Sequence, residues 1–324
     1  MPIWRRRFLR LACGLAALPL ARRAARAESY PARSVRIIVA TSAAGGTDIA
    51  ARLVAQWLTE RLGQSFFVEN HPGGNNNIGT EMAARAAPDG YTLFMANSVN
   101  AINTSLYPSR SYNFMADFQP VVHVVRSPLL MMVHPSVPAA TVPAFIAYAK
   151  ANPDRISMGS GGNGSTSHMA GELFMMMAGV RMVHVPYRGE SPAMADLLGG
   201  QAQVVFATTG SAIAYVKAGS VRALAVTMPT PLDGLDLPPL AQFLPGYEAH
   251  GWSGLCAPRS TPAEIVSLLN REINAGLADP TIRQRVADMG GTAPGGTPAD
   301  FARFIAEDTE KWARVARFLG TSAN

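Results

Sequence analysis

Two segments of the chain are rich in glycine, serine and threonine, and each directly follows a run of strand-forming residues. The first, residues 41–48, reads TSAAGGTD, and the second, residues 159–168, reads GSGGNGSTSH. Such a backbone can approach an anion closely, and its N–H groups and hydroxyls can donate hydrogen bonds to it, which suits a carboxylate. The same residues also form turns and helix N-caps, and this explains either segment taken alone. The two segments together favour the binding role.

Other chemistry fits the sequence poorly. Gly159, Gly161 and Gly164 have the spacing of a dinucleotide-binding loop, but His184 stands where that motif needs an acid about 20 residues further on. The sequence has neither a phosphate-binding loop with its lysine nor a Gly-x-Ser-x-Gly nucleophile elbow. Its six histidines lack the spacing of metal ligands. We therefore predict no cofactor, no bound metal and no catalytic residue.

Two charged residues near these segments have more than one explanation. Asp48 stands in the first turn of an expected helix, where the helix dipole alone favours a carboxylate, although it could also face a ligand. Arg188 lies between Tyr187 and Gly189 after an expected strand. It could hold a carboxylate in a bidentate pair, or it could be a solvated arginine or one that links two domains.

The two segments lie within an alternation of short strands and longer helices, which is typical of βα units around parallel strands. In open parallel sheets the ligand lies at the carboxyl ends of the strands, where the helices begin. The alternation predicts two sets of βα units. In the first we expect strands at 35–41, 66–69 and 91–96 and helices at 48–62 and 78–87. In the second we expect an apolar run at 129–134, helices at 142–151, 166–178, 193–198 and 211–218, and strands at 156–158, 182–185, 204–206 and 223–227.

The remaining segments suggest how the two sets are joined. Residues 228–246 read as a connector, and a strand follows at 252–257. Capping-box patterns at 261–264 and 297–300 predict helices in the tail, and an apolar stripe on the last helix must pack on another element. We place this tail on the first set rather than in a separate domain. The predicted fold is a hinged clamshell in which residues 28–127 and 252–324 form lobe 1 and residues 128–251 form lobe 2.

Composition limits the class of protein. The chain has 324 residues, of which 48% are hydrophobic and 15% charged, so it should fold, and no run approaches the ~20 apolar residues of a membrane-spanning helix. Its formal charge is +6, but seven of its 28 basic residues lie in the first 26 positions. Subtracting these seven leaves 21 basic against 22 acidic residues. This balance argues against binding to nucleic acid.

The N-terminus has the features of an export signal. Arginines precede an apolar stretch at 11–21, and the small-residue triplet Ala25-Arg26-Ala27 follows. We expect residues 1–27 to be a signal peptide cleaved after Ala27, with export to the periplasm by the twin-arginine or the general secretory route. An amphipathic helix of the mature fold is the alternative, and the lack of acidic residues argues against it. Cleavage would leave Cys256 as a single cysteine, which its apolar neighbours predict to be buried and unreactive.

Several stretches carry a resemblance to a known family: GGTDIAARL at 45–53, VENHPGG at 68–74, AAPDGYTL at 86–93, STSHMAGELF at 165–174 and HVPYRG at 184–189. Together they resemble the extracytoplasmic solute receptors of tripartite tricarboxylate transporters, the Bug family, over nearly all of the mature chain. The resemblance implies a two-lobed, type II-like periplasmic binding protein of the Venus flytrap kind, with a mainly parallel sheet in each lobe. It also implies that the two glycine-rich loops hold a small carboxylate through backbone donors and ordered water, and that a pair of membrane permease subunits receives it.

Three segments depart from the family pattern. Residues 40–44, ATSAA, stand where family members commonly have a proline-rich segment that contains an aromatic residue. Phe206-Ala207-Thr208 stands where many members have Phe-Asp-Asn. Residues 74–77, GNNN, carry more amides than the usual glycines. These changes favour a more polar pocket, suited to a hydroxylated acid or one with several carboxylates rather than to a flat aromatic acid.

We therefore expect a non-catalytic, monomeric α/β receptor that closes on a small organic carboxylate. The expected ligand contacts are Thr41, Ser42, Gly45, Gly46, Asp48, Ser160, Gly161, Ser165, Thr166, Tyr187 and Thr208. Two alternatives remain open: a receptor that serves a membrane sensor, and an exported α/β hydrolase with a serine such as Ser165 as its nucleophile. The hydrolase lacks a suitably spaced base.

Overall fold

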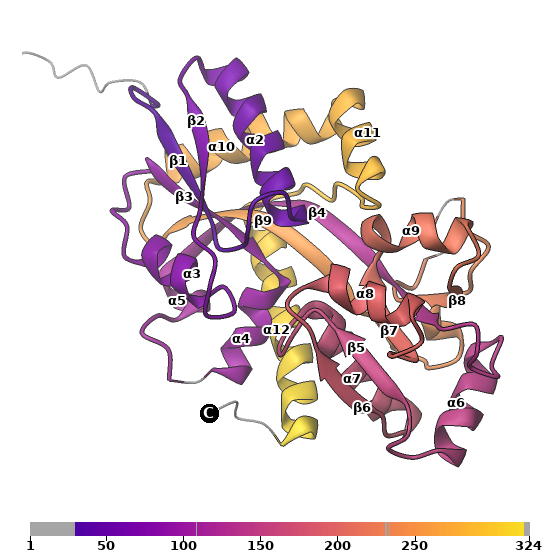
Figure 1. The fold of residues 1–324 in the computed structure, drawn as a ribbon. Coiled ribbons are helices and arrows are strands. Elements are labelled where there is room, and N and C mark those ends of the chain that lie inside the picture. Colours follow the sequence, from indigo (N-terminus) through magenta and orange to yellow (C-terminus); the bar gives the residue numbers. More distant parts are fainter. Residues whose placement is uncertain (1–29, 108, 231, 233, 321–324) are drawn as a thin grey trace, which may run out of the picture. The chain divides into compact units, whose positions relative to one another are not determined.

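The computed structural model describes residues 30–107, 109–230, 232 and 234–320. The chain divides into a short N-terminal unit, Met1–Ala32, and a second unit, Arg33–Asn324, and only the second is described below. Figure 1 shows its strands and helices. The expected signal peptide, residues 1–27, lies outside the described residues.

The first strand set consists of three parallel strands, each followed by a helix. The strands are β1 (Val35–Val39), β2 (Phe66–Asn70) and β3 (Thr92–Asn97), and the helices are α2 (Gly46–Leu62), α3 (Asn77–Ala84) and α4 (Ser98–Leu106). The α2 helix ends at Gly63, which has a φ of 71° that costs glycine no steric strain. The predicted elements of this set are confirmed to within a few residues, except that α4 was not predicted.

The second strand set repeats this arrangement. Its parallel strands are β5 (Ser157–Ser160), β6 (Val183–Pro186) and β7 (Val204–Thr208), and the helices that follow them are α7 (Thr166–Ala178), α8 (Glu190–Leu198) and α9 (Thr209–Lys217). An earlier helix, α6 (Val142–Ala151), leads into β5. The α7 helix matches its predicted bounds because Ser165 caps its first turn and Gly179 ends it in the left-handed conformation.

Two long strands join the sets. The β4 strand (Phe118–Val133) pairs antiparallel with β9 (His250–Pro258) up to Pro128, and its remaining residues pair antiparallel with β7 and with β8 (Arg222–Val226). The resulting order is β2-β1-β3-β9-β4-β7-β5-β6, with β8 beside β4. All antiparallel pairs of these strands involve β4 or β9, so the parallel βα units lie at the two ends of the sheet. The sequence predicted only the second part of β4.

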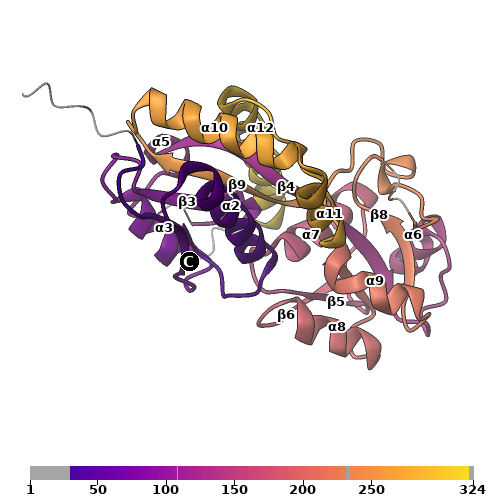
Figure 2. The same cartoon turned by 90° about the horizontal axis from the view of Figure 1, so that it is seen from above.

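Three helices lie in the C-terminal part of the chain, and two of them cover the strands that join the two sets. They are α10 (Ala263–Ala278), α11 (Pro280–Asp288) and α12 (Pro298–Leu319), and the short α5 (Phe114–Asp117) and the 3-10 helix η1 (Leu240–Gln242) lie earlier in the chain. Figure 2 shows α10 and α12 along β4 and β9. The α12 helix buries Phe301, Ile305, Trp312 and Val315 and packs against α4, β4 and α7. It therefore contacts helices from both strand sets.

One of the two predicted capping boxes is confirmed. Thr297 and Asp300 form it at the start of α12, where the Thr297 hydroxyl accepts a hydrogen bond from Asp300 N. The other prediction was wrong. The Thr261 hydroxyl donates to the carbonyl oxygen of Pro258 at 2.8 Å, so it does not cap α10.

A continuous core connects the two sets. One cluster of buried side chains contains Ile38 and Phe94 of the first set, Met131 of β4, and Phe174 and Phe206 of the second set. The predicted α/β class is confirmed. Within the residues that the structure describes, no helix is long and apolar enough to cross a membrane.

Candidate ligand-binding site

The first loop, residues 41–48, connects β1 to α2. Its residues 42–46 are exposed, whereas Asp48 is buried. The Asp48 carboxylate accepts hydrogen bonds from Ala44 N, Arg52 Nε and Asn70 Nδ2, each at 2.9 Å. Burial raises the pKa of this carboxyl, but the hydrogen bonds from Arg52, Ala44 and Asn70 outweigh it and leave the pKa below its usual value. Asp48 thus holds the loop in shape, and its contact with a ligand stays a prediction.

Two threonines of this loop, Thr47 and Thr41, lie next to neighbouring strands. The Thr47 hydroxyl accepts hydrogen bonds from Asn97 Nδ2 and Ser253 Oγ, both at 3.3 Å. Asn97 in turn accepts a hydrogen bond from Asn76 Nδ2 at 3.0 Å. The Thr41 hydroxyl oxygen is buried and has no hydrogen-bond partner among the described residues. The ends of β1 and β3 and the loop around Asn76 therefore form one polar region.

The second loop, residues 159–168, connects β5 to α7. Ser160 is fully buried, and its hydroxyl lies 2.6 Å from His184 Nε2 and accepts a hydrogen bond from Gly162 N. The Ser165 hydroxyl caps α7 by accepting a hydrogen bond from His168 N. The predicted contacts Ser160 and Ser165 are thus engaged within the loop. Gly161 and Thr166 are partly exposed.

A pair of histidines lies against this loop. The rings of His168 and His184 stack with their centroids 3.8 Å apart. His168 Nδ1 accepts a hydrogen bond from Gly164 N, which places the ring proton on Nε2, 3.3 Å from Glu172 Oε1. Burial, and then the neighbouring His168, lower the pKa of His184 to about 3. His184 is therefore neutral near pH 7.

The two remaining predicted contacts are hydrogen-bonded within the second strand set. The Tyr187 hydroxyl donates to Asp196 Oδ2 at 2.6 Å, and burial together with this carboxylate raises the pKa of Tyr187 to about 12. The Thr208 hydroxyl donates to Glu190 Oε2 at 2.8 Å. Both residues lie at the carboxyl ends of strands, as expected, and their contact with a ligand stays a prediction.

The two strand sets meet at the first residues of two helices. Ser98 begins α4 and Thr166 begins α7, and their hydroxyl oxygens lie 2.7 Å apart. Close by, a Cβ built on Gly164 would lie 2.8 Å from both Asn75 Nδ2 and Leu106 Cδ1. Since Asn97 also bonds to Thr47, the first and second loops are connected through the start of α4. Helix N-termini from both sets are thus close together.

Four residues of this region, Asn75, Asn97, Ser98 and Ser253, were not among the expected ligand contacts, although Asn75 belongs to the amide-rich segment 74–77. Asn97 and Ser98 could have been found, because they follow β3 at the carboxyl end of a parallel strand. Asn75 and Ser253 reach the region only through tertiary packing. The position at the end of a parallel strand, and not a sequence motif, would therefore have identified Asn97 and Ser98.

A groove of about 900 Å³ lies beside α9 and α11. Its lining includes Thr209 and Gly210 at the start of α9, Arg283 and Asp288 of α11, and Lys217. Its charged lining residues are thus the cationic Lys217 and Arg283 and the acidic Asp288. None of the predicted site residues lines this groove.

Comparison with known proteins shows the family. Residues 50–321 match the model of the TctC family, the tripartite tricarboxylate transporter family receptor. Protein BugT of Bordetella pertussis is 34% identical over 298 residues, which cover 91% of this chain and 91% of that protein. The chain belongs to this family of solute-binding receptors, as the sequence resemblance predicted.

Solved structures share the fold over most of the chain. R. palustris Rpa4515 with adipate has a TM-score of 0.81 and 35% sequence identity, and the match covers 90% of this chain and 98% of that one. MatC (Rpa3494) from Rhodopseudomonas palustris with bound malate has a TM-score of 0.77 and 29% identity, with 88% and 99% covered. The periplasmic binding protein BugD has a TM-score of 0.78 and 32% identity, with 90% and 99% covered. The predicted periplasmic-binding-protein fold is confirmed.

Proposed function

We propose that this protein is a periplasmic receptor that captures a small organic carboxylate between its first and second loops. It then delivers the carboxylate to the membrane permease subunits of a tripartite tricarboxylate-type transporter. Family membership supports the receptor role, and the adipate and malate bound to two structural neighbours support a carboxylate ligand. A signal peptide at residues 1–27 exports the chain, and the mature receptor acts as a monomer.

The observation that carries this proposal is the Ser98–Thr166 contact at 2.7 Å, because it brings together helix N-termini from both strand sets. Backbone N–H groups at such termini attract anions. In the proposed cycle, lobe 1 (residues 28–127 and 252–324) and lobe 2 (residues 128–251) close on the ligand. The ligand shifts the equilibrium toward the closed form by its higher affinity for that form.

The proposed first contacts of the ligand are those of the two loops, namely Thr41, Ser42, Gly45, Gly46, Asp48, Ser160, Gly161, Ser165 and Thr166, with Tyr187 and Thr208 beside them. Of these, the exposed residues in the range 42–46 and the partly exposed Gly161 and Thr166 are the most accessible. The polar loop around Asn75 and Asn76 supports a hydroxylated acid or one with several carboxylates.

A hydrolase is less well supported. Ser160 and His184 lie at the distance of a nucleophile and its base, but the Ser160 side chain is fully buried and accepts a hydrogen bond from Gly162 N. The Ser165 hydroxyl is used to cap α7. Neither serine is placed to attack a substrate.

The proposal can be tested with the mature chain, residues 28–324. Isothermal titration calorimetry with adipate, malate, citrate, nicotinate and terephthalate should give saturable binding of one aliphatic acid per chain. Native mass spectrometry of the freshly purified protein should detect a retained small acid. Absence of binding across the panel, or turnover of an ester panel, would contradict the receptor role. A preference confined to aromatic acids would contradict the polar pocket.

A further inference from the structure

Arg188 lies on a turn that is fixed directly against the second loop. Tyr187 N donates to Ser160 O at 3.0 Å, and Gly189 N donates to Gly161 O at 3.2 Å. These two hydrogen bonds flank Arg188 and hold its backbone beside the loop. Gly189 has a φ of 114°, which glycine adopts without strain and which sets the direction of the turn.

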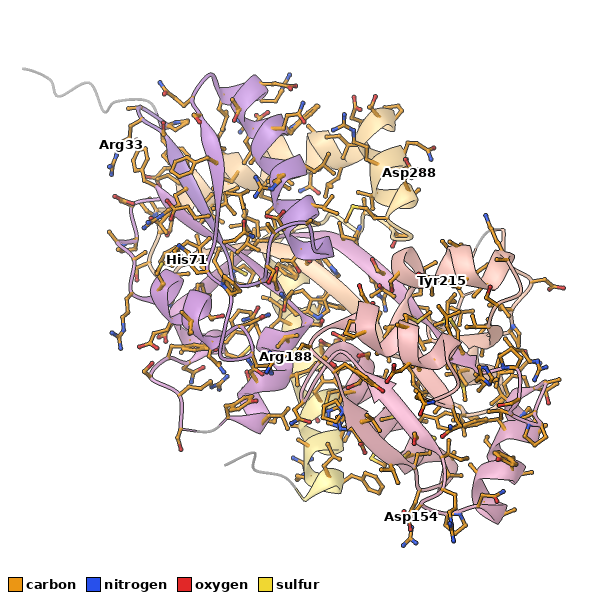
Figure 3. The ribbon with its side chains drawn as sticks, viewed as in Figure 1. Arg33, His71, Asp154, Arg188, Tyr215 and Asp288 are labelled. Carbon is orange, nitrogen blue, oxygen red and sulfur yellow. The ribbon has the colours of Figure 1, made fainter. Side chains whose placement is uncertain are left out.

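The Arg188 side chain is exposed and has no ion-pair or hydrogen-bond partner among the described residues. Most arginines of the described chain have one, such as Arg52 with Asp48 and Arg181 with Asp154. Figure 3 shows Arg188 near the middle of the view, whereas Asp154 lies at its lower edge. An arginine without a partner among the described residues therefore lies beside the second loop, which we propose to bind the ligand.

The acids around the two loops are all engaged elsewhere. The Glu190 carboxylate accepts hydrogen bonds from Thr208 and Ser211, and Asp196 accepts one from Tyr187. On the other strand set, Asp48 is paired with Arg52. No protein carboxylate among the described residues contacts the Arg188 guanidinium, and the nearby carboxylates accept hydrogen bonds from other groups.

We propose that Arg188 determines specificity by holding the second carboxylate of a dicarboxylate ligand, and this inference rests on the proposed function. The first carboxylate binds at the helix N-termini of the two loops. The guanidinium presents a fork of N–H donors that fits a carboxylate in a bidentate pair. A monocarboxylate of the same length offers nothing to this fork, so it gains no affinity from Arg188.

Two pairs of acids separate this contact from the rest of the site: succinate with butyrate, and adipate with hexanoate. Each pair has the same number of carbons and differs by one carboxylate. We expect the wild-type protein to prefer the diacid in at least one pair. Arg188→Gln should weaken binding of that diacid about ten- to hundredfold and change binding of the monoacid less than about twofold. Arg188→Lys should restore part of the preference, because lysine keeps the charge but not the fork.

Arg155→Gln is the matched control. Arg155 is also exposed and has no ion-pair partner among the described residues, but it precedes β5, whereas Arg188 follows the parallel strand β6. The two arginines therefore lie at opposite ends of these strands, and Arg155→Gln should leave both affinities unchanged. If Arg188→Gln leaves the diacid preference intact, or weakens the mono- and diacid equally, the inference is wrong while the receptor function stands. If the wild-type protein binds no carboxylate, the proposed function fails and the inference falls with it.

Discussion

The stacked rings of His168 and His184, with their centroids 3.8 Å apart, link α7 to β6 and lie against the second loop. Through His168 Nδ1 the pair fixes Gly164 N, and through His184 Nε2 it contacts the Ser160 hydroxyl. The loop that we propose to bind the ligand is thus held in place by two imidazoles. One of them, His184, has a pKa lowered to about 3 by burial and by its neighbour.

Acid should therefore weaken the fold through His184. Between pH 6.5 and 3 the unfolded chain binds a proton at this residue that the folded chain does not, so the free energy of unfolding falls as the pH falls. Allowing for partial exposure of the ring, we expect His184 to account for about 1 kcal/mol of the loss between pH 7 and 5. Urea unfolding at both pH values measures it. The variant His184→Gln should lose less unfolding free energy between pH 7 and 5 than the wild-type protein. The control His134→Gln changes a histidine outside the stacked pair and should lose as much as the wild-type protein. Equal losses in all three proteins would refute this role.

Removing the Ser98 hydroxyl should weaken ligand binding. In Ser98→Ala, the contact with Thr166 between the two strand sets is lost while Thr166 itself is retained. If the contact belongs to the closed form, the loss of a neutral hydrogen bond of about 0.5–1.5 kcal/mol should lower affinity about two- to tenfold. Calorimetric titration measures the change. Ser105→Ala, on the same helix, should leave affinity unchanged, and a matching loss there would show that α4 responds non-specifically.

Substitution of Gly164 should lower stability more than substitution of Gly161. Gly164 has a φ of 71°, and an added Cβ would lie 2.8 Å from Asn75 and Leu106. Gly164→Ala should therefore cost about 1–3 kcal/mol of unfolding free energy. At Gly161 the nearest atoms lie at 3.5 Å, which is an ordinary contact, so Gly161→Ala should cost less than about 1 kcal/mol. Urea unfolding of both variants gives the comparison. Similar losses of unfolding free energy would mean that Gly164 is not closely packed against Asn75 and Leu106.

Asp48→Asn distinguishes the two explanations of this residue. The carboxylate accepts hydrogen bonds from Ala44, Arg52 and Asn70, so its loss should cost about 1–3 kcal/mol of unfolding free energy at pH 7. Because the pKa of Asp48 is lowered in the folded chain, this contribution is present above the unfolded pKa and lost as the pH falls below it. Thermal unfolding and titration with ligand should be measured on the same sample. A loss of affinity without a loss of stability would favour direct contact with the ligand.

Cys256 should not react in the folded protein. It is fully buried in β9, and burial raises the pKa of its thiol. Because the thiolate is the reactive species, we expect no reaction with an aromatic disulfide reagent over hours under native conditions, and complete reaction in concentrated urea. Rapid reaction of the native protein would show that β9 opens readily.

The elements that the sequence predicted well are those whose ends carry local signals. The α7 helix is bounded by the Ser165 cap and by Gly179, and both can be read from neighbouring residues. The first part of β4 was missed because Pro120 and Pro128 argue against a strand. The pairing is irregular just after Pro120, and Pro128 pairs with the first residue of β9, so the sheet accommodates both prolines.

The candidate site was predictable in part for the same reason. Glycine-rich segments after strands identified the two loops, since strand ends and helix starts are encoded locally. The partners of those loops were not predictable. Ser98 and Thr166 are 68 residues apart in sequence, and their contact depends on how the two strand sets are joined. The internal partners of Asp48, Ser160 and Tyr187 likewise follow from packing.

The continuity of β4 has a mechanical consequence. This strand runs without a break from its pairing with β9 into its pairing with β7 and β8, and Pro128 lies opposite His250 where the change occurs. Movement of one end of the sheet against the other must therefore bend a hydrogen-bonded strand, because no flexible linker replaces β4 at this point. Each step of such bending would strain the hydrogen bonds that β4 makes with its neighbours, so we expect the two ends of the sheet to move through a small angle.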